Sequence, residues 1–490
     1  MRKFILLSFA FTLLFSCSKD DEVIPKEGEN PTDKVTLNNK VNNFVWKAMN
    51  SWYNWQEDVP NLADSKDDNT NDYYTYLNSF STPNSLFESL KHADDDFSWF
   101  IEDYVAQQQQ FQGTSKTFGF RPQLVQVGTT DYVVMYVQHV SKGSPADLEG
   151  FKRGDIINAI NGTVMTLSNY KSVFNGYFEE TSEFSFTEKD GQTFKEKKTI
   201  TQAVVSDNPV HLTKIFDNVN GKKVGYLLYN GFRSSYNDEL NAAFGELKYA
   251  GVQELVLDLR INGGGSVQTS AYLASMIHEE AGKDKFAELK FNNKHPKQDS
   301  PYYFSNTLNV YGVDGRKTSE ETINRLSGIS KLYVLTSDKT ASASEMIING
   351  LRPFIEVKLI GTKTVGKNEG SITLYDSPTT DYTFHDGKGV NTSHKMAMQP
   401  IVFQIYNKLG QNDYGDGFEP NILIEEWKHW DNILPFGDEN EIVLKTALDD
   451  IRGLSAKSTY EVKSFGRIDI NVSINKFEQE MYIDSHYFNK

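Results

Sequence analysis

Two short apolar runs, each ending in a cluster of small residues, constrain the fold of this chain more than any other feature. Glu254–Leu259 leads into Gly263–Gly265, and Lys331–Thr336 leads into a cluster that contains Ser342 and Ser344. Helical patterns separate these runs, which predicts strands that alternate with helices and pair in a largely parallel sheet. Because sites in such sheets lie beyond the carboxyl ends of the strands, we expect both clusters at one edge.

A lysine is expected at the same edge. After the serine cluster come an apolar helical stretch and a further β run, Val357–Ile360, which ends in a glycine-rich turn that carries Lys367. Small residues that follow a strand and open a helix expose a side chain together with unpaired backbone N–H groups. This arrangement favours a nucleophile in the serine cluster.

Size and composition limit the classes of protein to consider. The 490 residues predict two to four domains, and the 38% hydrophobic and 13% aromatic residues are sufficient to fill their cores. A formal net charge of −16 argues against a general nucleic-acid-binding protein. The single cysteine, Cys17, excludes an intrachain disulfide.

The start of the chain resembles a bacterial lipoprotein signal. A basic start and the mostly apolar Phe4–Phe15 precede Leu14–Cys17, which resembles a lipobox, where the signal is cut before a cysteine that is then lipidated. We expect a signal peptide over residues 1–16 and a lipidated, flexible tether over residues 17–40. The protein is then expected in the cell envelope, anchored through lipid to the outer membrane and facing the periplasm or the cell surface. An ordinary signal peptide with an incidental cysteine is the alternative.

The rest of the chain divides by its hydrophobic period. An apolar stripe at helical spacing from Val41 to Trp52 predicts a small helical core, and Phe97–Val105 is also expected to be helical. Phe286–Gly312 is polar and irregular, and is expected to be an insertion over the site. The expected fold is a multidomain mixture of α/β and α+β parts: an N-terminal helical domain, a β domain, an α/β domain and a C-terminal extension, over residues 41–113, 115–205, 210–453 and 454–490.

The β domain resembles a PDZ domain. The resemblance rests on the ordered set Gly143–Ala146, Gly154–Ile157 and Asn161-Gly162, the last being a strong hairpin signal. Phe118-Gly119-Phe120 lies where such domains carry their carboxylate-binding loop. In that family, backbone N–H groups of this loop hold a peptide C-terminus, and the peptide adds a strand to the sheet edge. The motif predicts the fold and does not by itself specify peptide binding.

Other chemistries fit the central segment less well. Gly361–Lys367 has the spacing of a nucleotide-binding Walker A loop, but the next residue, Asn368, lacks the hydroxyl that Mg²⁺ binding needs, and a strand pattern follows in place of a helix. A Ser-His-Asp hydrolase lacks its G-x-S-x-G turn, and the nearest histidines, His385 and His394, are expected to be loop residues. A zinc site lacks support, because no H-E-x-x-H motif occurs and the single cysteine is assigned to lipidation. No metal and no cofactor are expected.

The ordered motifs resemble those of the tail-specific, or C-terminal processing, peptidases. The motifs are Asp258–Gly265, then Thr340–Glu345, then Lys367 at 25 residues beyond Ser342, with a PDZ domain ahead of them. The resemblance covers roughly residues 40–453. It implies a crotonase-like α/β catalytic domain, a serine–lysine dyad and polypeptide substrates that are unfolded or offer a C-terminal segment.

The same resemblance implies a role for each matched residue. Ser342 would be the nucleophile and Lys367 the general base, with Ser344 as the alternative nucleophile. Glu345 would position the active site. The backbone N–H groups of Ala343 and Gly264 would form the oxyanion hole, although Gly263 and Gly265 are of the same type. Many members have a glutamine four residues after the lysine; here Ser371 occupies that position, and either it orients the lysine or the lysine is oriented differently.

The chemistry requires a neutral lysine. A serine hydroxyl needs an adjacent base to attack an amide. Lowering a lysine pKa from about 10.4 to about 7 takes roughly 4–5 kcal/mol of destabilisation of the ammonium, for which burial is the available cause. The expected protein is a lipid-anchored serine endopeptidase with PDZ-assisted substrate capture. A peptide-binding or scaffold lipoprotein with a degenerate catalytic domain is the alternative.

Overall fold

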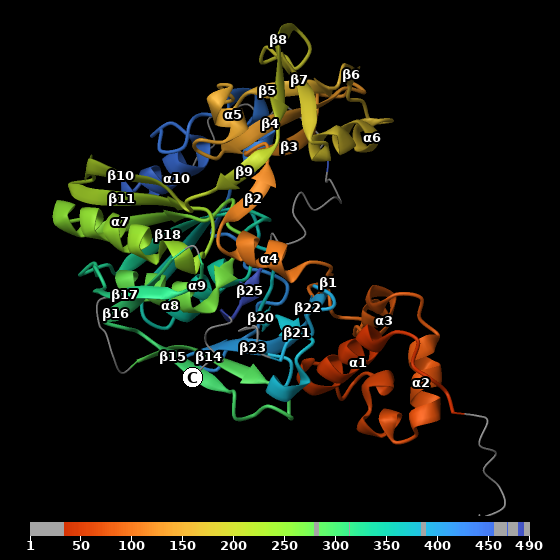
Figure 1. The fold of residues 1–490 in the computed structure, drawn as a ribbon. Helices are drawn as coiled ribbons and strands as arrows, with labels where there is room; N and C mark the ends of the chain where they lie inside the picture. Colours follow the sequence, from red (N-terminus) through yellow and green to blue (C-terminus); the bar gives the residue numbers. More distant parts are fainter. Residues whose placement is uncertain are drawn as a thin grey trace, which may run out of the picture.

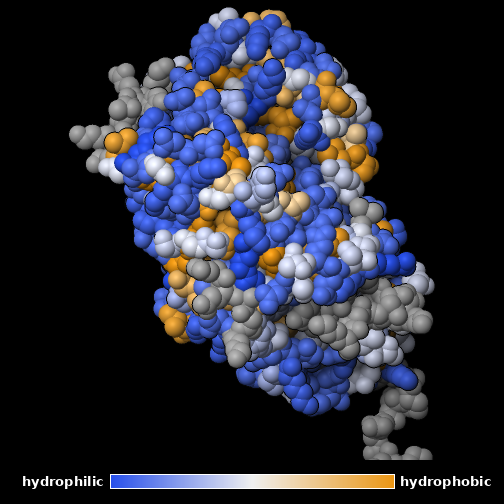
Figure 2. Space-filling view, turned by 90° about the vertical axis from the view of Figure 1, so that its left-hand side faces the viewer, coloured by the Kyte–Doolittle hydropathy of each residue, from blue (hydrophilic) through white to orange (hydrophobic). Residues whose placement is uncertain are grey.

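The computed structural model describes residues 34–278, 284–312, 314–383, 389–454, 468 and 479–484. The predicted signal peptide, the predicted lipidation site Cys17, His385 and most of the C-terminal extension lie outside these residues. Within the described ranges, every helix is too short or too polar to span a lipid bilayer. Figure 2 shows a largely hydrophilic face on which hydrophobic groups gather in small separate areas.

Three helices form the N-terminal unit, at the lower right of Figure 1. The predicted stripe faces inward along α1, where Trp46 and Trp52 are buried. The Trp46 ring meets the edge of Tyr73 from α2, with ring centroids 5.0 Å apart. This confirms the predicted helical core. The elements of this unit are α1 (Lys40–Trp52), η1 (Pro60–Leu62), η2 (Asp64–Asp67), α2 (Thr70–Asn78) and α3 (Pro83–Ser89).

The helix expected over Phe97–Val105 is wrong. The Asp95 carboxylate accepts hydrogen bonds from the N–H groups of Phe97 and Ser98 at 3.0 and 2.8 Å and turns the chain. Strand β1 (Trp99–Ile101) follows and pairs antiparallel with β22 (Ala397–Gln399), which also pairs with β21 (Leu374–Tyr375). Pairing with a strand far along the chain overrides the local pattern here. Helix α4 (Tyr104–Phe111) begins only after Asp103, whose side chain caps it.

A six-stranded antiparallel sheet forms the β domain at the top of Figure 1. Its order is β3-β4-β5-β7-β8, with β6 paired to β5, and the predicted turn at Asn161-Gly162 joins β5 to β6. Strand β3 is an edge of this sheet. A ribbon of β2 and β9 connects the domain to the rest of the chain. The elements are β2 (Thr114–Thr117), β3 (Phe120–Gln126), β4 (Val133–Val140), α5 (Pro145–Leu148), β5 (Ile156–Ile160), β6 (Thr163–Val164), α6 (Tyr170–Phe174), η3 (Asn175–Phe178), β7 (Thr181–Thr187), β8 (Phe194–Thr201) and β9 (Ala203–Ser206).

A largely parallel sheet carries the predicted clusters, as expected. Its order is β10-β11-β12-β18-β19-β24, and only the pairing of β10 with β11 is antiparallel. Helices α7, α8 and α9 pack on one face of this sheet and α10 on the other. The elements are β10 (Val210–Val219), β11 (Lys222–Tyr229), η4 (Ser234–Tyr236), α7 (Asn237–Ala250), β12 (Glu254–Asp258), α8 (Val267–Ile277), β18 (Lys331–Thr336), α9 (Ala343–Leu351), β19 (Glu356–Gly361), β24 (Ile422–Leu423), η6 (Glu426–Asn432) and α10 (Ile442–Ile451).

A second, mixed sheet corrects the prediction of an irregular insertion over Phe286–Gly312. This stretch forms strands because Phe286 and Leu289 are buried, and the Phe286 ring packs directly against Gly350 of α9. The sheet order is β13-β25-β20-β23-β14-β15, so the C-terminal strand β25 lies inside it. Its strands are β13 (Gly265–Ser266), β14 (Lys285–Phe291), β15 (Ser300–Tyr303), β20 (Glu369–Ser371), β23 (Ile401–Asn407) and β25 (Met481–Tyr482). Strands β16 (Thr307–Tyr311) and β17 (Lys317–Thr322) form a separate two-stranded sheet, and η5 (Pro378–Thr380) is a short helical turn.

Candidate active site

The two small-residue clusters meet at one edge of the parallel sheet. Strands β12 and β18 are direct neighbours, with Asp258 opposite Leu335, so their carboxyl ends deliver both loops to the same place. The Asn262 carbonyl joins the loops, because it accepts hydrogen bonds from the Ala341 N–H at 3.3 Å and from the Ser344 hydroxyl at 3.0 Å. The structure therefore brings the glycine cluster and the serine cluster together.

Ser342 has a strained backbone and a buried hydroxyl. It lies directly before α9 with φ 65° and ψ −118°, a region that non-glycine residues rarely adopt and that costs about 1–3 kcal/mol. The residue is fully buried, and among the described residues no group is hydrogen-bonded to its Oγ. Strain of this kind persists where the surroundings fix the backbone, and it clusters at functional sites.

The hydrogen bonds distinguish the two serines. The Ser344 hydroxyl donates to the Asn262 carbonyl and so joins the two loops. The Ser342 hydroxyl has no such bond within the described part of the chain. Ser342 is therefore the better candidate for a nucleophile, and Ser344 has a structural contact of its own.

Glu345 connects the serine to the lysine turn. Its buried carboxylate accepts hydrogen bonds from the Ser342 N–H at 2.8 Å, the Gly366 N–H at 2.7 Å and the Lys367 N–H at 2.8 Å. The Thr364 hydroxyl donates to it as well. Burial raises the pKa of Glu345, and these four donors oppose the shift because they favour the ionised form. Glu345 thus fixes the backbone on both sides of the site.

Lys367 is a buried lysine with a lowered pKa. Its side chain is fully buried, and burial lowers its pKa to about 8 against the opposing charges of Glu369, Glu480 and Asp95. Its Nζ lies 4.8 Å from the centre of the Phe97 ring. With a pKa near 8, about a tenth of the lysines are neutral at pH 7, compared with well under a hundredth for an ordinary lysine. Lys367 therefore has the property that a general base requires.

Ser342 and Lys367 are not hydrogen-bonded to each other; both lie beside the same short segment. Lys367 Nζ donates to the Gln479 carbonyl at 2.7 Å. The next carbonyl oxygen, that of Glu480, lies 2.1 Å from the point that a Cβ on Gly264 would occupy, and the Ser342 Cβ lies 2.7 Å from the same point. Two consecutive carbonyl groups of the C-terminal segment thus lie beside the lysine and the serine.

The glycine expected to line the oxyanion hole is placed differently from the prediction. The Gly264 N–H donates to the Asn262 side-chain oxygen at 2.9 Å, so this donor is already engaged within its own loop. The Gly265 N–H instead donates to the Glu480 carbonyl at 2.6 Å. Gly264 has φ 112°, and a Cβ there would overlap the Glu480 oxygen, so only glycine fits. The Ala343 N–H opens α9 beside Gly264, as expected for a second donor.

The expectation that Ser371 orients Lys367 is not supported by its contacts. The Ser371 hydroxyl donates to the Met481 carbonyl at 3.0 Å and accepts from the Gln399 amide at 3.0 Å. The register of β20 places Ser371 opposite Tyr482 of β25, which explains this direction. Ser371 therefore contacts the C-terminal strand.

The loop Phe118-Gly119-Phe120 lines a cavity of about 290 Å³ in the β domain, together with Ser141 and Gln202. The side chains of Phe118 and Phe120 are buried in the domain core, so backbone and neighbouring polar groups face the cavity. A second cavity, of about 130 Å³, extends from Arg121 to Arg233 and Glu480. Both cavities are lined by Gln110, Ser115, Arg121, His139 and Asp207, so they are neighbours.

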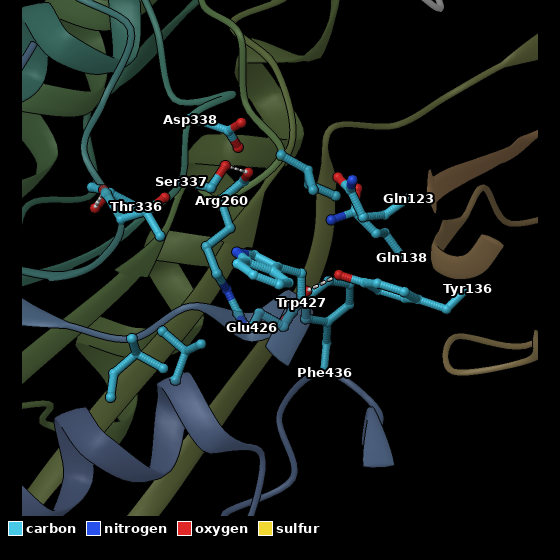
Figure 3. A pocket seen from close by; sticks show the side chains of 14 residues that line it. Gln123, Tyr136, Gln138, Arg260, Thr336, Ser337, Asp338, Glu426, Trp427 and Phe436 are labelled. Atoms are coloured by element: carbon cyan, nitrogen blue, oxygen red, sulfur yellow. Dashed lines mark hydrogen bonds and ion pairs between the residues drawn. The ribbon is translucent and has the colours of Figure 1, made fainter. Parts of the chain in front are cut away.

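Arg260, from the loop after β12, forms the floor of a small pocket between the β domain and the parallel sheet (Figure 3). Its guanidinium contacts the carboxylates of Asp258, Glu426 and Glu441 at 2.7, 2.7 and 2.9 Å. Arg153 of the β domain also pairs with Glu426. This pocket of about 40 Å³ lies between the two domains, and Ser342 is not among the residues that line it.

Sequence reasoning missed three residues of the site: Arg233, Asn262 and Glu480. Arg233 follows β11, so the rule that sites lie beyond the carboxyl ends of parallel strands indicated its region. Asn262 lies inside the glycine motif. Glu480 had no local signal, because its position follows from a strand pairing that spans the chain.

The rejected alternatives receive no support. A strand, β20, follows Lys367 where a nucleotide-binding loop would require a helix. His394 pairs with Asp376 at 3.2 Å and with neither candidate serine. Within the described ranges, no group of three or more His, Cys, Asp or Glu side chains is arranged so that it could hold a metal ion.

Two family models match this chain. The model of peptidase family S41 matches residues 223–422, and that of the peptidase S41 N-terminal domain matches residues 40–99, which together is just over half of the chain. The first match begins in β11 and ends in β24, so it contains Ser342, Lys367 and the glycine cluster.

Individual relatives extend over more of the chain. A "Probable CtpA-like serine protease" of Staphylococcus aureus (strain MRSA252) is 23% identical over 468 residues, which is 92% of this chain and 78% of the relative. A "Carboxyl-terminal-processing protease" of a Picosynechococcus species is 28% identical over 271 residues, which is 55% of this chain and 57% of the relative. The solved "Putative S41 protease" of Bacteroides fragilis NCTC 9343 superposes with a TM-score of 0.65 at 25% identity, over 86% of this chain and 98% of that one.

Proposed function

Because the chain belongs to peptidase family S41 and is a serine-type peptidase, we propose that it hydrolyses peptide bonds in unfolded or C-terminal segments of proteins. Ser342 is the nucleophile and Lys367 the general base. One relative is named a carboxyl-terminal-processing protease, and its similarity to this chain supports this choice of substrate.

One observation carries this proposal. A strained, fully buried serine and a buried lysine of lowered pKa lie beside consecutive carbonyl groups of one extended segment. Such an arrangement presents a nucleophile and a base to a peptide backbone. The inactive-scaffold alternative requires neither strain at Ser342 nor a lowered pKa at Lys367.

The first half of the reaction forms an ester. The Ser342 hydroxyl attacks the carbonyl carbon of the scissile bond while its proton passes to neutral Lys367, which must leave the Gln479 carbonyl to accept it. The N–H groups of Gly265 and Ala343 stabilise the oxyanion, each contributing about 3 kcal/mol. The carbon–nitrogen bond then breaks, and Lys367 returns the proton to the departing amine.

The second half regenerates the serine. A water molecule gives its proton to Lys367 and attacks the ester carbon, and the same two N–H groups stabilise the second oxyanion. The bond to the Ser342 oxygen breaks, the serine regains its proton from Lys367, and a new peptide carboxylate leaves. Glu345 takes no proton in this scheme and holds the backbone of both residues.

Substrate capture is assigned to the β domain. The edge strand β3 and the loop Phe118-Gly119-Phe120 offer a place for a peptide to add a strand, which is the binding mode of PDZ domains. The shared lining of the two cavities supports a path from this loop to Arg233 at the site. A lipid on Cys17 would tether this apparatus to the outer membrane, and labelling with a fatty-acid precursor, lost in Cys17→Ser, tests that part.

Proteolysis of an unfolded protein tests the proposal. Two forms of the protein are compared: one from residue 34 to the C-terminus, and one from residue 34 to Leu454. Each is incubated with casein and with a reduced, alkylated protein. Ser342→Ala and Lys367→Ala are each expected to lower kcat/KM by more than about 1,000-fold while the circular dichroism spectrum is retained.

Ser344→Ala is the matched control, because it removes a neighbouring hydroxyl whose one hydrogen bond among the described residues is to the Asn262 carbonyl. Its loss of activity is expected to stay below about tenfold, as for a single structural hydrogen bond. Undiminished cleavage by Ser342→Ala would refute the assignment of the nucleophile. Absence of cleavage by every form would favour the scaffold alternative.

A further inference from the structure

The C-terminal strand lies in the cleft beside Ser342 and Lys367. Strand β25 fits between β13 and β20 and pairs in parallel with both. Without β25, these two strands would face each other across a gap of one strand, each with an unpaired edge. An extended peptide of any origin can complete such a gap through backbone hydrogen bonds.

The backbone of this segment has the position of a substrate. The Gln479 carbonyl accepts from Lys367 Nζ, and the Glu480 carbonyl accepts from the Gly265 N–H at 2.6 Å. The point that a Cβ on Gly264 would occupy lies 2.1 Å from the Glu480 oxygen and 2.7 Å from the Ser342 Cβ. The distance between these two atoms therefore cannot exceed the sum of the two values. The Glu480 carbonyl therefore lies where the carbonyl of a scissile bond is expected.

The side chains of the segment are held as specifically as its backbone. Glu480 is 2% exposed, and its carboxylate accepts from the Arg233 guanidinium at 2.7 Å. The Tyr482 ring stacks on Phe111 with ring centroids 4.0 Å apart. Asp484 accepts from the hydroxyl of Ser234 at 2.9 Å. A half-buried arginine such as Arg233 recognises a carboxylate strongly, since its planar donors match the carboxylate geometry.

The cleft continues beyond this segment. The cavity of about 130 Å³ is lined by Glu480 and Arg233, and also by Arg121 and Asp207, which line the cavity of the β domain as well. A longer polypeptide in the place of the segment can therefore extend toward the β domain. A substrate channel is expected to continue in this way, whereas a strand that only completes a sheet does not require a cavity beside it.

We propose that Gln479–Asp484 occupies the substrate cleft as a substrate-like strand, and that Arg233 selects an acidic side chain on the residue whose carbonyl lies beside Ser342. The proposal rests on the peptidase function proposed above and names its substrate class: extended segments cut after an acidic residue. In this register the bond between the acidic residue and the next one breaks, as the Ser342 oxygen bonds to the acidic residue's carbonyl carbon and the following nitrogen takes the proton from Lys367. The chain's own tail competes with such substrates.

Removal of the tail tests the competition. The form that ends at Leu454 is compared with the full chain on a quenched fluorescent peptide, with circular dichroism to check that it folds. Its kcat/KM is expected to rise by about tenfold or more, which corresponds to the loss of one tightly held competitor. The specific activity of the full chain is expected not to change with protein concentration, because the competitor is part of the same molecule.

A point variant keeps the test independent of truncation. Glu480→Lys in the full chain opposes Arg233 with a like charge, and it is expected to raise kcat/KM at least about threefold; a charge reversal on the exposed Glu149 is the control and is expected to leave it unchanged. A synthetic peptide of residues 477–486 is expected to inhibit the truncated form competitively. Unchanged activity in Glu480→Lys and no inhibition by the peptide would overturn the proposal.

Specificity is tested with two peptides that differ only in glutamate or glutamine at one position. The truncated form is expected to cut the glutamate peptide at least about tenfold faster, after that residue, with the difference in KM. Arg233→Met is expected to lower kcat/KM for the glutamate peptide at least about tenfold and so to abolish this ratio. A glutamate-to-glutamine ratio that Arg233→Met leaves unchanged would refute the role of Arg233.

The outcomes separate this proposal from the one on which it rests. If neither the full nor the truncated form cuts any substrate, the peptidase proposal fails and this one with it. If both forms cut at the same rate and the tail peptide does not compete, the peptidase proposal stands and the tail is only a strand of the sheet. A wild-type product that ends at Glu480, absent from Ser342→Ala, would support the proposed register.

Discussion

At the residue scale, burial sets the protonation of two neighbouring groups at the site. It lowers the pKa of Lys367 to about 8 and raises the pKa of Glu369 to about 7. Glu369 is the nearby carboxylate that most favours the charged lysine. Both pKa shifts favour the neutral forms of Lys367 and Glu369 over a charged pair, so part of Lys367 is neutral near the pH at which a general base must act.

The first prediction concerns pH. Because the proposed base is neutral Lys367, kcat/KM is expected to rise from pH 6, to be half-maximal near pH 8 and to level off about one pH unit higher. Glu369→Gln removes a charge that raises the lysine pKa, so the rise is expected to move to lower pH. Rate profiles from pH 5.5 to 9.5 at constant ionic strength measure both effects. A profile that falls between pH 6 and 8 would contradict the role of Lys367.

The second prediction concerns the strain at Ser342. Glycine adopts φ 65° with little cost, whereas alanine keeps the strain of serine. Ser342→Gly is therefore expected to be more stable than Ser342→Ala by about 1 kcal/mol, although both variants are expected to be inactive. Urea unfolding followed by fluorescence compares the two variants. Equal stability would show that the surrounding structure relaxes in the alanine variant.

At the element scale, the site depends on how the start of α9 is joined to the turn between β19 and β20. Glu345 makes this connection through the N–H groups of Ser342, Gly366 and Lys367. The motif in the sequence placed Glu345 in the first turn of a helix, where the helix dipole alone explains an acidic residue. The structure adds the hydrogen bonds from the Gly366 and Lys367 N–H groups, which join the start of α9 to the turn after β19.

The third prediction follows from this connection. Glu345→Gln keeps the shape of the side chain but replaces one acceptor oxygen by a donor, so the turn that carries Lys367 is expected to shift. A displacement of this size is expected to lower kcat by about 10- to 100-fold with little change in KM. Steady-state kinetics measure the two constants separately, with Glu356→Gln at an exposed ion pair as the control. A rise in KM alone would place Glu345 in substrate binding.

At the scale of the whole molecule, a buried cluster of charges holds the β domain against the parallel sheet (Figure 3). Glu426 contacts Arg153 of the β domain and Arg260 of the loop after β12. Lys339 adds a hydrogen bond to Gln138 of β4 at 2.8 Å. These contacts fix the orientation of the β domain, and with it the loop Phe118-Gly119-Phe120, relative to the parallel sheet.

The fourth prediction tests this attachment. Glu426→Ala leaves two buried guanidinium groups with one partner fewer, and it is expected to destabilise the chain by about 3–5 kcal/mol. Glu425→Ala, which breaks the neighbouring pair with Lys428, is expected to cost less than about 1 kcal/mol. Urea unfolding measures both. Equal effects would mean that the buried cluster does not hold the domains together.

The sequence alone predicted the features that depend on local pattern. The largely parallel sheet, the hairpin at Asn161-Gly162 and the convergence of both small-residue loops follow from period, turn chemistry and the rule for strand ends. The helix expected at Phe97–Val105 and the insertion expected at Phe286–Gly312 are wrong, because both stretches pair with strands that are remote in the sequence. The roles of Ser342 and Lys367 remain proposals.

The sequence by itself therefore determined which reactive side chains follow which strands, since that depends on neighbours along the chain. Only the tertiary structure decided which backbone N–H groups and which charges face the cleft. The Gly265 N–H faces the cleft because Asn262 takes the Gly264 N–H, and Arg233 meets Glu480 because β25 enters the gap between β13 and β20. The direction of an amide and the pairing of distant strands depend on the whole fold, and no local pattern encodes either one.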